Sequence, residues 1–144
     1  GTLYTPQIVG FAKALEIGVE SMKSESERFM QLKKQLWSMF EPLDGIYLNG
    51  DFTHSLPNNL NLSVEGVNGS ALLLALQPLV AVSSGSACSS ESTAPSHVLT
   101  ALGRDKKLAQ ASLRFGIGRF NTAEEITTVG ETAIATIKSL RQAS

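Results

Sequence analysis

The sequence has 144 residues, a formal net charge of −1 and a hydrophobic fraction of 42%. This length predicts one domain with a real core, and the near-neutral charge argues against a nucleic acid or a membrane surface bound through bulk charge. The longest nearly apolar stretch, residues 71–82, is interrupted by Gln77 and Pro78 and is too short to span a bilayer. A single cysteine excludes an internal disulfide. Together with two distant histidines, His54 and His97, it does not make a structural zinc site.

The first forty residues predict a long helix. Thr5 and Pro6 have the pattern of an N-cap followed by proline at the first helical position. Apolar residues then recur at helical spacing, and no proline interrupts them before Pro42. We expect one helix, or two in line, of roughly 50 Å, with its glutamates and lysines forming a solvated face. The apolar positions are Ile8, Phe11, Ala12, Leu15, Val19, Met22, Phe29, Leu32, Leu36 and Phe40.

The middle of the chain predicts short elements. Residues 45–48, 60–64 and 80–83 are candidates for extended segments, and residues 71–76 suit a short buried helix. Residues 83–96 then form a polar stretch of small side chains, which is typical of a loop.

The last third of the chain completes the predicted fold. Pro95 is expected to open a short helix that Gly103 closes. Apolar residues alternate with Arg and Gly over residues 112–118, which predicts a strand. Thr122 and Glu125 make a capping box for a final helix. The fold class predicted is α+β, with helices packed on one face of a small antiparallel or mixed sheet.

Cys88 is the first candidate for chemistry. A lone cysteine is usually a small buried hydrophobe, but no large apolar side chain lies between Ser83 and His97 to bury this one. An exposed, mobile loop is therefore expected, which would let a thiol approach and leave a reacting atom. No His, Lys or Arg close in sequence would lower the pKa of the thiol. The stretch lacks the Gly-x-x-x-x-Gly-Lys pattern of a phosphate loop, and Ser86 lacks the Gly-x-Ser-x-Gly pattern of a hydrolase.

Arg114 is the second candidate. In the predicted strand it shares a face with Ser112, Gly116 and Gly118, and the two glycines leave that face open to a close approach. A guanidinium in mid-strand needs an anionic partner, and its planar fork suits a carboxylate. The alternative is an internal ion pair with Asp or Glu. Arg119 is expected to be an ordinary surface or ion-pairing residue, and both histidines are expected to have hydrogen-bonded structural roles.

Two of these segments resemble cysteine desulfurases of the iron–sulfur-assembly type. Residues 83–88 resemble the active-site loop of the first of that family's two groups, and residues 112–120 resemble its substrate-arginine strand. Shorter similar segments are residues 1–3, 7–10, 47–51 and 56–61. The resemblance covers essentially the whole chain. It implies that residues 1–144 form the C-terminal small domain of a fold-type I pyridoxal-phosphate enzyme.

The resemblance also implies a reaction and its residues. The complete enzyme would convert L-cysteine to L-alanine and leave a persulfide on Cys88, for delivery to an iron–sulfur scaffold or another acceptor. Arg114 would hold the substrate carboxylate. Thr2 matches a residue that reaches the cofactor phosphate of the neighbouring subunit in a homodimer. No resident metal is expected, although Cys88 could share an iron–sulfur cluster.

The sequence departs from that family in one important respect. None of its lysines matches the cofactor lysine, which belongs to a large domain expected before Gly1, and the chain stops short of the C-terminal tail that many members carry. We therefore expect these residues alone to be inactive and to bind no cofactor. The alternatives are a non-catalytic sulfur-carrier or interaction module, and a related enzyme such as a selenocysteine lyase. The expected compartment is the cytoplasm, with the mitochondrial matrix as the alternative. The lysines, all expected on helix surfaces or a charged turn, are Lys13, Lys23, Lys33, Lys34, Lys106, Lys107 and Lys138.

Overall fold

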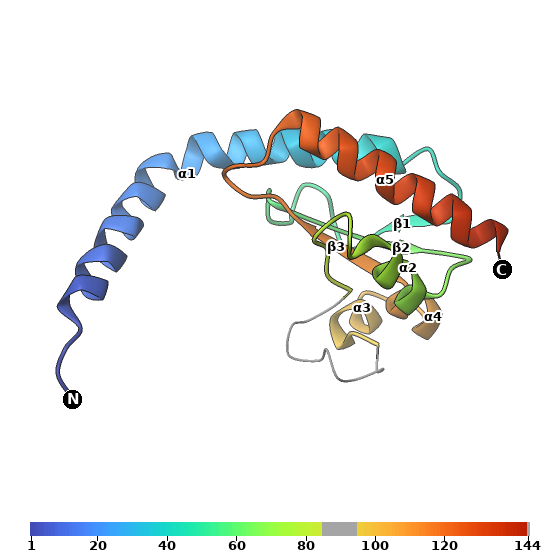
Figure 1. The fold of residues 1–144 in the computed structure, drawn as a ribbon, viewed down its shortest axis with the longest axis horizontal. Helices are drawn as coiled ribbons and strands as arrows, with labels where there is room; N and C mark the ends of the chain where they lie inside the picture. Colours follow the sequence, from blue (N-terminus) through green and yellow to red (C-terminus); the bar gives the residue numbers. More distant parts are fainter. Residues whose placement is uncertain (85–94, 144) are drawn as a thin grey trace.

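The computed structural model describes residues 1–84 and 95–143. Figure 1 shows the chain from the long N-terminal helix to the C-terminal helix. In chain order the elements of the described ranges are α1 (Thr5–Phe40), β1 (Ile46–Leu48), β2 (Asn59–Val64), α2 (Gly69–Leu76), α3 (His97–Ala101), α4 (Lys106–Gln110), β3 (Ser112–Gly116) and α5 (Ala123–Gln142). None of these helices has the length and apolar character needed to cross a membrane.

The three strands form one antiparallel sheet in the order β1-β2-β3. Its register places Leu62 of β2 opposite both Leu48 of β1 and Leu113 of β3. Helices α1 and α5 run side by side along one face of this sheet (Figure 1). The α+β prediction is therefore confirmed, with the sheet fully antiparallel.

The main core fills the space between that face of the sheet and the helices above it. Leu36 and Phe40 of α1 are buried there, together with Leu60 of β2, Phe115 of β3 and Ile137 of α5. The rings of Phe40 and Phe115 pack with their centroids 5.7 Å apart. These side chains hold β3 against α1, and so fix the strand that carries Arg114.

Local sequence signals account for several helix boundaries. They do not account for the start of α1, where Tyr4 is the N-cap residue in place of the expected Thr5 and no side chain caps the helix. The capping box of α5 is confirmed, because the Thr122 side chain accepts from the Glu125 amide while the Glu125 side chain accepts from the Thr122 amide. Helix α3 ends before Gly103, whose φ of 83° suits a helix terminus. Residues 106–110, interpreted from the sequence as part of a charged turn, instead form α4, because the Asp105 side chain accepts from the Leu108 amide and caps it.

Residues 80–83, expected to be a third extended segment, do not form a strand. Only Ser83 pairs with the sheet, through an isolated antiparallel bridge to Arg114. The segment diverges from β3 before this bridge. The prediction was wrong because a short apolar run suits an extended conformation but does not specify whether the chain will pair with a strand of the sheet.

The sequence left open one long helix or two in line, and the structure has one continuous helix, α1, of 36 residues. Only part of its apolar stripe joins the core. The side chains buried along it are Leu32, Lys33, Leu36 and Phe40, all in its second half. The first half extends away from the sheet (Figure 1), and its apolar side chains are exposed. They include Ile8, Phe11, Leu15, Val19 and Met22.

Lys33 is the exception to the expected solvated face of α1. Its side chain is buried, with 1% of the residue exposed. The ammonium donates to Ser55 Oγ at 2.6 Å and to the carbonyl oxygens of Phe52 and Leu56 at 3.3 and 3.2 Å. It also lies 4.7 Å from the centre of the Phe52 ring. Burial lowers the pKa of Lys33, against a smaller opposing effect of the Asp51 carboxylate.

Candidate functional site

Arg114 lies on the face of β3 that points away from the main core. Its neighbours Leu113 and Phe115 are buried on the core side, and alternation places Arg114 on the other side, where it is half-buried. A Cβ added to Gly116 would meet no atom of residues 1–84 or 95–143 within 4 Å. The predicted open face is therefore confirmed next to Arg114. At the other end of the strand it is closed, because Ser112 is buried.

The chain that leads toward Cys88 is fastened to this same strand. The Arg114 amide donates to the Ser83 carbonyl at 2.7 Å, and the Ser83 amide donates to the Arg114 carbonyl at 3.2 Å. The Ser112 hydroxyl donates to the Ser84 carbonyl at 3.1 Å. The Arg114 guanidinium lies 3.5 Å from Ser83 Oγ, at the outer limit of a hydrogen bond. Cys88 itself lies outside the described residues.

The charge of Arg114 is not matched by a carboxylate in the described parts of the chain. The ion pairs found there join Lys13 to Glu16, His54 to Asp51 and Arg119 to Glu25. The alternative of an internal ion pair for Arg114 thus finds no support within residues 1–84 and 95–143. Its guanidinium can bind an anion through several N–H donors at once.

Arg119 has the ordinary role that its position predicts. Its guanidinium pairs with the Glu25 carboxylate of α1, with one contact at 2.8 Å. Arg28 of α1 donates to the carbonyl oxygens of Gly118, Arg119 and Asn121, the last at 2.8 Å. These bonds hold the turn after β3 against α1. They also position the C-terminal end of β3, the strand that contains Arg114.

Thr2 does not meet Arg114 within this chain. Thr2 is exposed and precedes the N-terminal end of α1. The N-terminus lies well away from β3 in Figure 1. The role in a neighbouring subunit that was predicted for Thr2 stays a prediction.

The histidines and acidic residues do not gather into a metal site in the part of the chain that the structure describes. His54 Nδ1 lies 3.0 Å from Asp51 Oδ1, which confirms a hydrogen-bonded role for this residue. Asp51 also accepts from the amides of Thr53 and His54, and these bonds hold the pKa of Asp51 well below its ordinary value. His97 is exposed at the start of α3, and its role stays a prediction.

The lysines do not offer a position suited to pyridoxal phosphate, which is bound through a lysine. Lys33 is buried and its ammonium already donates to three oxygen atoms, so the expectation that it lies on a helix surface is wrong. The other lysines are exposed, as expected. Thr2 is the one cofactor contact that was expected among the described residues, and it is exposed. We therefore assign no reaction step to a cofactor held by this part of the chain.

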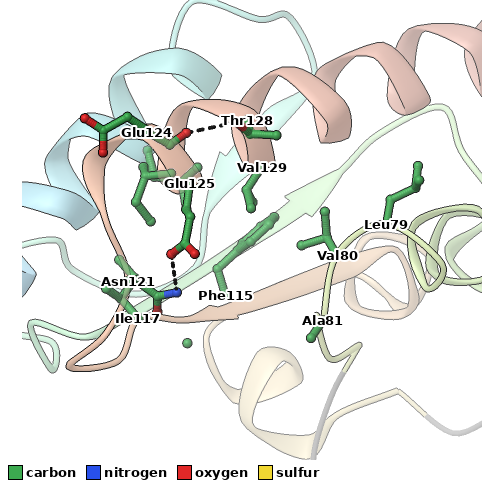
Figure 2. A pocket seen from close by; sticks show the side chains of 13 residues that line it. Leu79, Val80, Ala81, Phe115, Ile117, Asn121, Glu124, Glu125, Thr128 and Val129 are labelled. Atoms are coloured by element: carbon green, nitrogen blue, oxygen red, sulfur yellow. Dashed lines mark hydrogen bonds between the residues drawn. The ribbon is translucent and has the colours of Figure 1, made fainter.

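A groove of about 630 Å³ lies on the opposite face of β3 from Arg114. Figure 2 shows Phe115 and Ile117 at its floor, residues 79–81 on one side and the first turns of α5 on the other. Leu36 of α1 also lines it. The groove was not predicted from the sequence, because it depends on where residues 79–81 run relative to β3 and α5.

The structure is therefore an α+β domain. Its edge strand β3 carries the Arg114 guanidinium on one face, and Ser83 and Ser84 are bonded to the same strand. The family model for aminotransferase class-V matches residues 1–129. The chain belongs to the class-V aminotransferase family.

Two curated relatives narrow this similarity. A cysteine desulfurase IscS from Aeromonas hydrophila subsp. hydrophila is 50% identical over 126 residues, which cover 88% of this chain and 31% of the relative. A cysteine desulfurase IscS from Escherichia coli O139:H28 is 47% identical over 144 residues, which cover 100% of this chain and 35% of the relative. The chain thus spans about a third of the length of these relatives.

Solved structures agree with the fold. A NifS-like protein superposes with a TM-score of 0.82 at 30% identity, over 97% of this chain and 35% of that chain. A NifS-like protein from Rickettsia africae superposes with a TM-score of 0.81 over 96% of this chain and 36% of that chain. At 23% identity this second likeness supports the fold alone.

Proposed function

We propose that these 144 residues are the C-terminal small domain of a pyridoxal-phosphate-dependent cysteine desulfurase, which converts L-cysteine to L-alanine and leaves a persulfide on Cys88. The identity of 47% to a cysteine desulfurase over all 144 residues supports this proposal. The rest of the polypeptide would hold the cofactor, which supplies an electron sink for the substrate carbon.

The one observation in the fold that carries the proposal is the attachment of residues 83 and 84 to β3. Two backbone hydrogen bonds join Ser83 to Arg114, and a third bond joins Ser84 to Ser112. Cys88 follows Ser84 by four residues, so covalent geometry keeps their Cα atoms within roughly 14 Å of each other. The proposal therefore assigns the thiol and the guanidinium to one active site.

In this proposal Arg114 binds the substrate carboxylate through its planar fork and orients the amino acid with its sulfur toward Cys88. The Cys88 thiolate attacks the substrate sulfur. A sulfur–sulfur bond forms and the carbon–sulfur bond breaks, and its electron pair stays with the substrate carbon, which takes a proton to give alanine. Cys88 then holds the transferred sulfur as a persulfide.

The experiment uses the full-length protein with pyridoxal phosphate and L-cysteine. Cys88→Ser should abolish the persulfide, measured as the added mass of one sulfur on the peptide that contains residue 88. Retained sulfur transfer in this variant would contradict the proposal. Arg114→Lys should lower kcat/KM about 10- to 100-fold, since it loses charge-assisted hydrogen bonds worth about 1.5–3 kcal/mol.

The finer parts of the proposal concern assembly and delivery. We infer a homodimer in which Thr2 reaches the cofactor phosphate of the neighbouring subunit, a cytoplasmic location, and transfer of the persulfide to an iron–sulfur scaffold or another acceptor. A sulfur carrier that makes no persulfide of its own would not require Arg114. A persulfide that appears on Cys88 of the parent protein only when a separate desulfurase is added would favour that alternative.

A further inference from the structure

The face of the sheet that carries Arg114 also carries polar side chains from the other strands. Asn61 of β2 lies directly opposite Arg114 in the register. Because the backbone groups of Arg114 face outward and bond Ser83, Asn61 and Arg114 form a pair without backbone hydrogen bonds between them. In such a pair the Cα atoms are about 4.5 Å apart and the side chains are close. Asn61 is therefore the side chain of β2 next to Arg114 on this face.

A series of side-chain hydrogen bonds fixes which end of the Asn61 amide is occupied. Arg104 Nε donates to Asn49 Oδ1 at 2.7 Å. A guanidinium has donors only, so this bond requires the oxygen of Asn49, not its nitrogen, to face Arg104. The nitrogen of Asn49 then donates to Asn61 Oδ1 at 2.7 Å and to Ser63 Oγ at 2.9 Å. The oxygen of Asn61 is therefore an acceptor in this network, and its Nδ2 group remains as a donor.

The remaining donor of Asn61 is turned toward β3. Its oxygen points across the sheet to Asn49, on the side of β1, and the nitrogen diverges from the same carbon toward the other side, where Arg114 lies. Asn61 is half-buried, and no acceptor in residues 1–84 and 95–143 bonds its Nδ2 group. The Arg114 guanidinium lies near Ser83 Oγ, on the outer side of β3, whereas Asn61 lies on the inner side. The amide and the guanidinium can therefore donate to one carboxylate from two sides.

We propose that Asn61 is a second residue that binds the substrate carboxylate, donating from Nδ2 to a carboxylate that Arg114 also binds. Asn49 and Arg104 are then positioning residues, because their hydrogen bonds keep the donor end of the Asn61 amide turned toward the substrate. This inference rests on the proposed function, which assigns the substrate carboxylate to Arg114. A network that only joined the strands would need the same bonds from Arg104 to Asn61, but it would not need the Nδ2 donor.

Variants of the full-length protein with pyridoxal phosphate test the proposal. Asn61→Leu removes the donor and should weaken the binding of L-alanine, the proposed product, about tenfold, measured by equilibrium dialysis of the labelled amino acid. It should raise KM for L-cysteine by a similar factor and change kcat little, because the carboxylate is held alike before and during the reaction. Asn59→Leu is the matched control, since Asn59 lies on the same face of β2 opposite Gly116, and it should change neither constant. Constants for Asn61→Leu equal to those of the parent, or equal losses in the two leucine variants, would overturn the proposal.

A change at residue 49 tests the orientation of the amide. Asn49→Asp can still accept from Arg104, but it cannot donate to Asn61, whose Nδ2 group then turns toward the new carboxylate. L-alanine binding should weaken about tenfold, although residue 49 does not touch the substrate. In the Asn61→Leu background the same change should have no further effect, because no amide remains to be turned. Full additivity of the two changes would show a merely structural role and would overturn the assignment of Asn49 as a positioning residue.

Turnover of L-cysteine by the parent protein decides the proposed function separately. A parent that forms alanine while Asn61→Leu behaves like Asn59→Leu would overturn this inference alone. A parent that neither forms alanine nor binds it would overturn both.

Discussion

The two halves of helix α1 have similar apolar patterns, but the apolar side chains are buried in the second half and exposed in the first. In the second half, Leu36 and Phe40 are 1% and 0% exposed. In the first half, Phe11 and Leu15 are 72% and 59% exposed. Both pairs recur at helical spacing. The comparison teaches that periodicity predicts a helix and its apolar face, but contains no information on whether the same chain supplies something to cover that face.

The second half is covered because specific groups hold it close to its neighbours. Helix α5 approaches it at Gly130, where a Cβ would lie 2.5 Å from the Met39 sulfur. Arg28 bonds the turn after β3, and Lys33 bonds the loop between β1 and β2. The first half has no such attachment within the described residues beyond Ser21, which meets Arg119 at its end. Exposed apolar side chains gathered along one helix commonly mark an interface.

The largest predicted effect separates the two halves directly. In the 144-residue chain, Phe40→Ala should lower the free energy of unfolding by about 3–5 kcal/mol, because it removes a fully buried ring and leaves a cavity beside Phe115. Phe11→Ala should change it by less than about 0.5 kcal/mol, because that ring is exposed. Urea unfolding followed by circular dichroism measures both. A loss for Phe11→Ala as large as for Phe40→Ala would mean that the first half is packed in solution.

Local patterns made part of this architecture predictable. Thr122 and Glu125 cap α5 through neighbours three residues apart, and the alternation of residues 112–118 assigned Arg114 its face without knowledge of the rest of the fold. The failures are non-local. The partners of Lys33 lie 19 to 23 residues further along the chain, and the groove beside Gly116 depends on where residues 79–81 leave the sheet. No pattern around either residue specifies those distances.

A smaller effect is expected at Lys33, which joins the second half of α1 to the loop after β1. Lys33→Ala should cost about 1–3 kcal/mol, because the carbonyl oxygens of Phe52 and Leu56 lose their buried donor. Lys34→Ala, on the exposed face of the same helix, is the matched control and should change stability by less than about 0.5 kcal/mol. Equal costs for the two variants, measured by urea unfolding, would show that the buried contacts of Lys33 do not form.

The pH dependence of Lys33 sharpens this test. Burial lowers its pKa in the folded state below the ordinary value of 10.5, so between these two values the unfolded chain binds more protons than the folded one. Stability relative to Lys33→Met should therefore rise as the pH increases toward 10.5. A difference between the two proteins that stays constant over this range would contradict a lowered pKa.

The smallest effect is expected at Glu25, where the covered half of α1 begins. Its pairing with Arg119 lowers the pKa of the carboxyl below the ordinary value of 4.5. The folded state therefore favours the charged form, and the contribution of the pair is present above pH 4.5 and is lost as the pH falls through the folded value. Glu25→Gln should be slightly less stable than the parent chain at pH 7 and equally stable at the acid end. Glu27→Gln, which removes the same charge from an exposed position of the same helix, controls for net charge. If both variants follow one pH profile, the tie between α1 and the turn after β3 contributes nothing, and the boundary between the two halves must lie further along the helix, at Arg28 or Lys33.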